Sequence, residues 1–196
     1  MIKIKLFERL KENPFQTYEF PKFIDNQCEG WIYRISDNDA AKIPNTILNI
    51  GREMKIARML YESGISVPKL KGWEYVKVPQ EFDKPRKAFI MEFIEGRNGC
   101  ELYQGKYSNF EKYELAVRLA EEEIEKAKQL GFNLGFDEGN SSNYILTPNK
   151  KIKLIDFSAW FHPDVPEQKV IFRKGKIVHE NFVNPDSVFW PNKGVR

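Results

Sequence analysis

The sequence predicts an α+β fold in which short antiparallel strands are combined with a few helices. Strand-forming runs flank turn-forming residues at 31–43 and again at 144–155, as in antiparallel hairpins. Between these hairpins, the segments 46–61 and 108–130 repeat apolar residues at helical spacing. With 196 residues, 41% of them hydrophobic and 14% aromatic, the chain is long enough to bury one sizeable core or two small ones.

Composition and charge argue against several classes of protein. The 31 basic and 28 acidic residues are mixed along the chain, and a formal charge of +3 is small for a dedicated nucleic-acid binder. We find no apolar run that would span a bilayer, and the first residues lack the apolar core of a signal peptide. The two cysteines, Cys28 and Cys100, match no zinc-binding pattern, so we expect reduced thiols. These features predict a cytoplasmic protein without membrane contacts.

The first hairpin is followed by a predicted helix from about Thr46 to Tyr61, which Ser63 and Gly64 would end. Its apolar residues form one stripe: Ile50, Met54, Ala57, Leu60 and Tyr61. Glu53 falls inside this stripe, where a carboxylate is unfavourable unless it is paired. The alternative is that Glu53 lies at the edge of the stripe and extends to water.

Further strands are predicted at 67–70, 73–76 and 88–95, with a charged turn at 81–87. The segment 97–107 is predicted to be a loop, and we place a domain boundary there, which gives domains 1–96 and 97–196. Residues 108–111 have the form of a capping box that would begin a helix of about five turns, which Gly131 would end. Within that helix, the acidic run 121–123 is expected to face solvent.

The second hairpin predicts a metal site. Its strands, 144–146 and 151–155, are joined by a turn at 147–150, so the outer ends of the two strands should lie side by side. Asn143 comes just before the first strand and Asp156 just after the second. An amide oxygen and a carboxylate at the same rim are suited to Mg²⁺, which takes few protein ligands and completes its shell with water and phosphate oxygens.

These residues resemble motifs of the protein-kinase-like superfamily, especially its compact atypical branches: RIO kinases, the minimal kinase of the KEOPS complex and aminoglycoside phosphotransferases. Asn143 to Leu146 resembles the end of the H-G-D-L-x-x-x-N-I-L loop, and Asp156-Phe157-Ser158 resembles D-F-G. The step from Asn143 to Asp156, 156 minus 143, is 13 residues as in that family. The resemblance covers about residues 27–160. It implies a two-lobed fold with an antiparallel-sheet N-lobe (1–96) and a reduced C-lobe (97–196), which has no A-P-E motif.

The resemblance assigns nucleotide-binding roles in the first domain. Lys42 resembles the lysine of the third kinase strand, which holds ATP phosphates, and Glu53 resembles its helical partner. Gly30 is the only glycine at the place of the phosphate-covering loop, and Glu92 and Ile94 correspond to the hinge that meets adenine through backbone groups. Alternatives remain for each position: a surface lysine, a strand bulge at Gly30, and a buried strand that ends in a turn at 92–96.

The catalytic acid departs from the family pattern. Counting back five residues from Asn143 gives Glu138, with Asp137 before it, so either of these would orient the acceptor hydroxyl. The resemblance thus implies an ATP- and Mg²⁺-dependent phosphotransferase, with an acceptor that the sequence does not identify. The alternative is a pseudokinase, a binding or regulatory module without transfer. A further hypothesis is an acidic or RNA partner bound through the basic residues Lys84, Arg86, Lys87, Arg173, Lys174 and Lys176.

Overall fold

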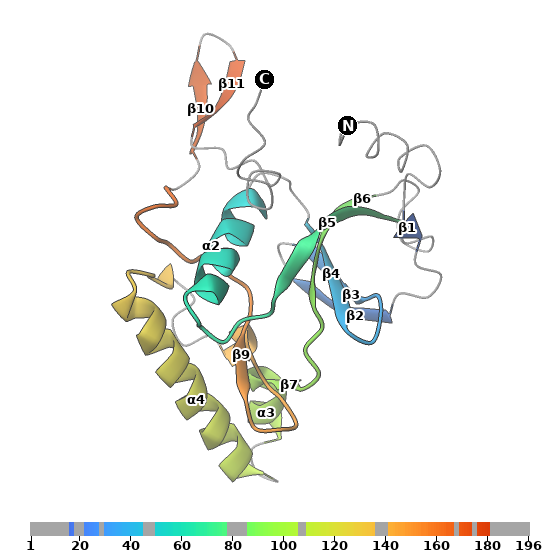
Figure 1. Ribbon diagram of the computed structural model, residues 1–196, viewed down its shortest axis with the longest axis vertical. Helices are drawn as coiled ribbons and strands as arrows, with labels where there is room; N and C mark the ends of the chain where they lie inside the picture. Colours follow the sequence, from blue (N-terminus) through green and yellow to red (C-terminus); the bar gives the residue numbers. More distant parts are fainter. Residues whose placement is uncertain are drawn as a thin grey trace. The chain divides into compact units, whose positions relative to one another are not determined.

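The fold was analysed in a computed structural model, which describes residues 16–17, 22–27, 30–44, 50–77, 86–105, 109–135, 141–166, 169–173 and 176–180. The chain divides into two compact units (Figure 1). The first unit comprises 1–46 and 70–93, and the second comprises 47–69 and 94–196. The mixed α+β composition and the antiparallel sheet confirm the coarse fold class of the sequence analysis.

The first unit contains a six-stranded sheet with the order β1-β5-β6-β4-β3-β2. All neighbouring strands are antiparallel except β1 and β5. The strands are β1 (Gln16–Thr17), β2 (Lys22–Gln27), β3 (Gly30–Arg34), β4 (Asp39–Pro44), β5 (Leu70–Lys77) and β6 (Arg86–Glu92). The predicted hairpin at 31–43 is confirmed as β3 and β4, which pair with Tyr33 opposite Ala41.

A small apolar core lies on one face of this sheet. Because side chains alternate along a strand, Ala41 and Ile43 face the same side, where they pack with Val76, Ala88 and Ile90. The predicted strands 67–70 and 73–76 are instead one strand, β5, and residues 67–69 lie outside it. Gly72, whose φ is 148°, accompanies a register irregularity in β5, and glycine accepts this conformation without a steric penalty.

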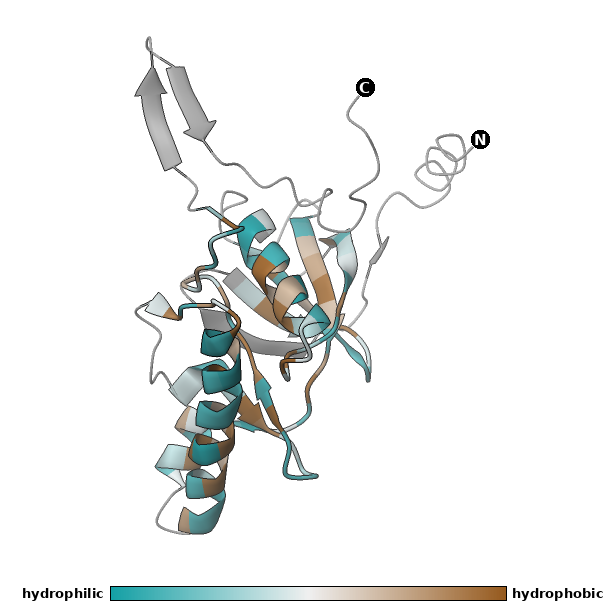
Figure 2. Cartoon of the chain, turned by 60° about the vertical axis from the view of Figure 1, so that its left-hand side comes forward, coloured by the Kyte–Doolittle hydropathy of each residue, from teal (hydrophilic) through white to brown (hydrophobic). Residues whose placement is uncertain are grey.

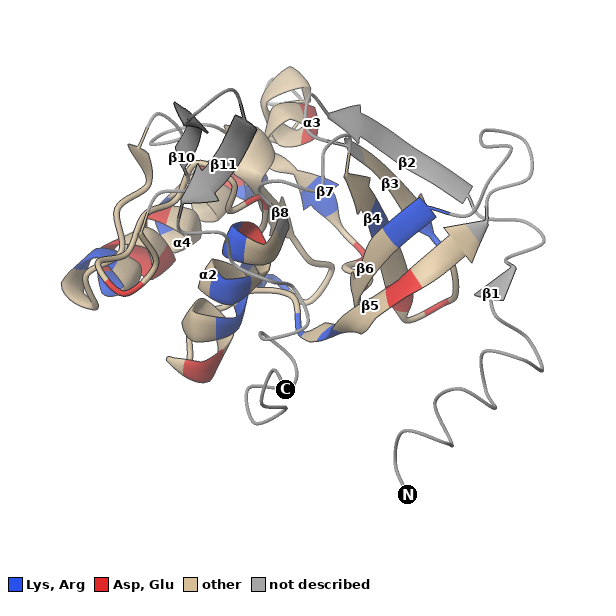
Figure 3. Ribbon diagram, turned by 90° about the horizontal axis from the view of Figure 1, so that it is seen from above, with Lys and Arg blue, Asp and Glu red and all other residues tan. Residues whose placement is uncertain are grey.

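The second unit begins with α2 (Ile50–Glu62), which confirms the predicted helix. Met54, Ala57 and Leu60 are buried as expected, but Tyr61 is 43% exposed and Ile56 is fully buried instead. The helix ends where predicted, because Gly64 adopts a left-handed φ of 81°. Figure 3 shows the basic residues of α2 in blue, and the helix carries Arg52, Lys55 and Arg58.

Hydrogen bonds explain why α2 belongs to the second unit although the sequence analysis placed it before residue 96. The segment that follows α2 runs beside β9 (Ile152–Leu154), where the Leu154 amide donates to the Ser66 carbonyl at 2.8 Å. The Ser66 hydroxyl donates to the Ile152 carbonyl at 2.6 Å, and its amide donates to Glu123 at 2.8 Å. These bonds join residues 57 to 88 positions apart in sequence, so local patterns do not reveal them.

The second unit also contains a three-stranded sheet with the order β7-β8-β9. The predicted hairpin at 144–155 is confirmed: β8 (Tyr144–Leu146) pairs with β9 with Tyr144 opposite Leu154. The predicted helix at 108–130 is confirmed as α4 (Phe110–Gln129), along which teal and brown residues alternate in Figure 2. Its N-cap is Asn109, which makes no side-chain capping bond to the described residues, and Ser108 of the predicted capping box lies outside the described residues.

The prediction of a loop at 97–107 is wrong for residues 97–104. This segment forms β7 (Arg97–Asn98) and α3 (Gly99–Gln104). The Glu101 amide donates to the Asn98 side chain and the Asn98 amide donates to the Glu101 carboxylate, at 2.8 and 3.0 Å. This capping box starts a helix within a segment that is rich in loop-forming residues.

The last described elements form a separate hairpin. β10 (Lys169–Arg173) pairs with β11 (Lys176–Glu180) in antiparallel orientation. None of the described helices has the length and hydrophobicity that a bilayer-spanning segment needs.

Candidate functional site

The β8-β9 hairpin brings Asn143 and Asp156 to one rim, as the sequence analysis expected. Asn143 ends a short 3₁₀ helix, η2 (Ser141–Asn143), directly before β8. The Ile155 amide donates to the Asn143 carbonyl at 2.8 Å, so the residue before Asp156 is hydrogen-bonded to Asn143. Both side chains are partly buried.

Asp156 has an unusual backbone. Its φ is 60°, and among the described non-glycine residues only Lys150, in the hairpin turn, shares a positive φ. Left-handed φ values are unfavourable for residues with a Cβ, although aspartate and asparagine tolerate them best. Such conformations persist where the surrounding structure holds them and where function uses them.

Asn143 offers a polar group that the described protein does not satisfy. The Ser142 hydroxyl donates to Asn143 Oδ1 at 3.0 Å, whereas Asn143 Nδ2 is buried and has no hydrogen-bond partner among the described residues. Because the hydroxyl can also accept, a half-turn of the amide keeps this bond and presents the oxygen in place of the nitrogen. The side chain can therefore offer a donor to a phosphate oxygen or an oxygen to a cation.

Gly99 of α3 packs closely against Ser141 of η2 and against Tyr144, the two residues that flank the Asn143 segment. A Cβ on Gly99 would lie 2.5 Å from Tyr144 Cζ and closer still to the Ser141 carbonyl oxygen. The Tyr144 ring is buried there, and desolvation raises the pKa of its hydroxyl to about 12. Gly99 thus lets α3 approach η2, which carries Asn143.

We expect Gly99→Ala to lower the free energy of unfolding by about 1–3 kcal/mol, because the backbone at Ser141 must move to admit the methyl group. Gly105→Ala is the matched control at the other end of α3, since its Cβ would come no closer than 3.5 Å to any atom. The control should change stability by less than about 0.5 kcal/mol. Urea denaturation of the three proteins measures both values. Equal stability of the two variants would contradict the close approach.

The donor set at the rim fits Mg²⁺. A carboxylate and an amide oxygen are hard ligands, and magnesium typically takes one or two such groups from protein. No cluster of three or more histidine, cysteine, aspartate or glutamate side chains occurs in the described part of the chain. The rim pair would therefore leave most of the coordination shell to water and phosphate oxygens.

Glu53 is buried on α2, with 8% of its surface exposed, so the alternative in which it extends to water is wrong. The residue before it, Arg52, is 6% exposed, and the sequence analysis did not single it out. Its guanidinium donates to the carbonyl oxygens of Ser158, at 3.0 Å, and of Trp160. Helical spacing could have indicated the burial of Arg52, because this residue lies four residues before the buried Ile56 and therefore on the same helix face.

Lys42 lies in β4 of the first unit, opposite Ile32 and Phe89 on the neighbouring strands. It is 3% exposed, which rules out the interpretation as a surface lysine. Its ammonium lies 5.8 Å from the centroid of the Phe89 ring, within cation–π range. Because Lys42 and Glu53 belong to different units, their pairing stays a prediction.

The other nucleotide-binding residues of the sequence analysis are also in the first unit. Gly30 begins β3 and pairs with Gln27 and Pro44 within the sheet. Glu92 ends β6 opposite Asp39, and Ile94 follows the strand. Their roles toward a nucleotide remain predictions.

Several candidates lie outside the described residues: Asp137, Glu138, Lys84 and Lys174. Of the basic residues suggested for a partner, Arg86 and Lys87 are in β6, where the Lys87 ammonium stacks over the Trp73 ring. Arg173 and Lys176 pair in register at the end of the β10-β11 hairpin. Their contribution to partner binding stays a prediction.

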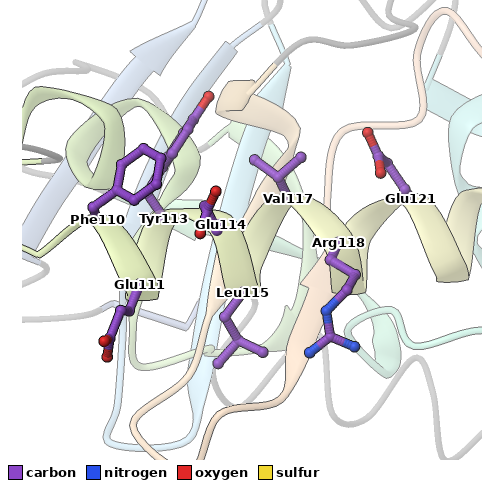
Figure 4. A pocket seen from close by; sticks show the side chains of 8 residues that line it. All are labelled: Phe110, Glu111, Tyr113, Glu114, Leu115, Val117, Arg118 and Glu121. Atoms are coloured by element: carbon purple, nitrogen blue, oxygen red, sulfur yellow. The ribbon is translucent and has the colours of Figure 1, made fainter.

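A shallow, open depression lies along residues 110–121 of α4 (Figure 4). Its described lining mixes apolar residues such as Phe110 and Val117 with charged ones such as Arg118. Lys42, Glu53, Asn143 and Asp156 are not among the described residues that line it.

No protein-family model matches this chain, and no curated protein sequence matches it.

Proposed function

We propose that the chain is an ATP- and Mg²⁺-dependent phosphotransferase of kinase-like architecture. The observation that supports this most is the left-handed backbone of Asp156 beside Asn143 at one end of the β8-β9 hairpin. An aspartate with an unfavourable backbone conformation and an unsatisfied amide, which come directly after and directly before the paired strands of one hairpin, suit a ligand that both side chains bind.

Each candidate site residue has a role in this proposal. Asn143 and Asp156 hold Mg²⁺, which neutralises phosphate charge when it is bound. Lys42 binds the α and β phosphates, and its burial strengthens the attraction because fewer water molecules screen the charge. Glu53 supplies the negative charge that keeps a lysine oriented in kinase-like proteins.

The transfer itself forms one bond and breaks one. The acceptor hydroxyl oxygen bonds to the γ-phosphorus, and the bond from that phosphorus to the oxygen that bridges it to ADP breaks. The hydroxyl proton passes to the carboxylate of Glu138 or Asp137, and ADP leaves with the electron pair of the broken bond.

The purified chain should convert γ-labelled ATP to ADP in the presence of Mg²⁺, with label on the protein or on released phosphate. Chelation of divalent cations with EDTA should abolish this turnover, and added Mg²⁺ should restore it. The same samples should unfold at a higher temperature with Mg·ATP than without nucleotide, because ligand binding stabilises the folded state.

The two hypotheses of the sequence analysis give different results in this experiment. Stabilisation by Mg·ATP without turnover would favour a binding module over an enzyme. If Mg·ATP causes no stabilisation and ATP is not turned over, the proposed phosphotransferase is contradicted.

A further inference from the structure

Arg52 joins α2 to the segment that follows Asp156. Its guanidinium donates to the Ser158 carbonyl at 3.0 Å and to the Trp160 carbonyl, and it lies 4.7 Å from the centroid of the Phe161 ring. A buried guanidinium is unfavourable unless its donors are satisfied. The planar fork of arginine suits two carbonyl acceptors at once, which a lysine ammonium does not match.

Residues of the same segment also bond to Asn133, which follows α4, and to Lys55 of α2. Asn133 and Phe161 exchange two backbone hydrogen bonds, of 2.9 and 2.7 Å, so the chain at Phe161 is fixed to the strand-like residue that follows α4. Lys55, one turn after Arg52 on α2, donates to the Asp164 carbonyl at 3.0 Å. Phe157 and Trp160 are buried and pack edge to face.

These contacts bear on the backbone of Asp156. The residue has a φ of 60°, which an unconstrained aspartate would leave for more favourable values. The chain is fixed on both sides of this residue, by the Ile155–Asn143 hydrogen bond before it and by the Arg52 bonds to Ser158 and Trp160 after it. Removal of the second fixed point would let the residues around Asp156 sample other conformations.

We propose that Arg52 is a positioning residue, which holds residues 158–161 and thereby keeps the Asp156 carboxylate in its cation-binding conformation. This inference rests on the proposed function in that Asp156 binds Mg²⁺. Arg52 and Glu53 are adjacent on α2, so one helix carries both the residue that fixes the metal-binding segment and the predicted partner of the phosphate-binding lysine. A cation that binds only one conformation of Asp156 loses apparent affinity in proportion to the population of that conformation.

The test compares Arg52→Gln and Arg52→Lys with the control Arg58→Gln. Arg58 lies on the same helix, but its side chain is 36% exposed and forms an ion pair with Glu62 one turn further along the helix. In Arg52→Gln, we expect faster hydrogen exchange at the amides of Trp160 and Phe161, with unchanged exchange in α4. The Mg²⁺ concentration for half-maximal ATP turnover should rise by about 10- to 100-fold, and saturating Mg²⁺ should restore most of the rate.

Arg52→Lys retains the positive charge but loses the two-pronged geometry, so it should behave like Arg52→Gln. It also provides the comparison if Arg52→Gln does not fold. Arg58→Gln should match the wild-type protein in both measurements.

Three results would overturn the inference. Unchanged exchange at residues 158–161 would show that Arg52 does not hold the segment. Exchange that rises equally in α4 would indicate a general loss of stability. A wild-type Mg²⁺ requirement in Arg52→Lys would show that charge alone suffices. If the wild-type protein turns over no ATP, the proposed function fails, whereas localised exchange in Arg52→Gln still supports the fixing of the segment.

Discussion

Replacement of Asp156 with asparagine is expected to lower Mg²⁺-dependent ATP turnover by about 10²- to 10³-fold while the fold is kept. Asparagine has nearly the same shape as aspartate and tolerates the left-handed φ of 60° found here. It removes the negative charge, which is the main attraction for a divalent cation. The loss should therefore fall on turnover and on the Mg²⁺ requirement, with little change in thermal unfolding.

Asp164→Asn is the matched control, because this carboxylate is in the same segment and its side chain is 79% exposed. Asp156→Gly adds a second comparison. It removes the carboxylate, so it should abolish turnover. Because glycine adopts a positive φ freely, the free energy of unfolding should stay equal or rise by up to about 1 kcal/mol. Turnover and its Mg²⁺ dependence, measured beside thermal unfolding, separate these outcomes. An Asp156→Asn variant with wild-type turnover would contradict the role of Asp156 in binding the metal.

The hairpins and long helices could be predicted from the sequence because their signals are local. Turn residues between strand-forming runs determine the β8-β9 pairing, and that pairing places Asn143 beside Ile155 and Asp156 without further information. The burial of Glu53 followed from its position within an apolar helical stripe. These inferences needed only the period of a helix or strand.

Other features depended on contacts that sequence patterns do not record. The helix α3 was predicted as a loop because the segment 97–107 is rich in loop-forming residues, whereas the reciprocal bonds of Asn98 and Glu101 start a helix. Arg52 was overlooked because arginine is usually exposed, and its burial depends on carbonyl groups 106 and 108 residues away. The association of α2 with the second unit depends on similarly distant partners.

Replacement of Lys42 with methionine is the second change for which we expect a large effect, a loss of about 10²- to 10³-fold in ATP turnover. Methionine has a similar length and flexibility but no charge, so it would fill the space beside Phe89 without attracting phosphate. Lys71→Met is the control: this lysine is also in the sheet of the first unit, but it is partly exposed and forms an ion pair with Asp39. The rate with saturating ATP and the Michaelis constant for ATP should both be measured, since phosphate binding contributes to each.

The variant Glu53→Gln completes the comparison. Residues that act as a unit show strongly non-additive effects on catalysis. If Glu53 acts by orienting Lys42, Lys42→Met already removes its contribution, so the double variant should turn over ATP no more slowly than Lys42→Met alone. Additive losses in the double variant would show that the two residues act independently. A wild-type rate in Lys42→Met would exclude Lys42 from phosphate binding, because a buried ammonium that contacts the phosphates of ATP could not be removed without a change in rate.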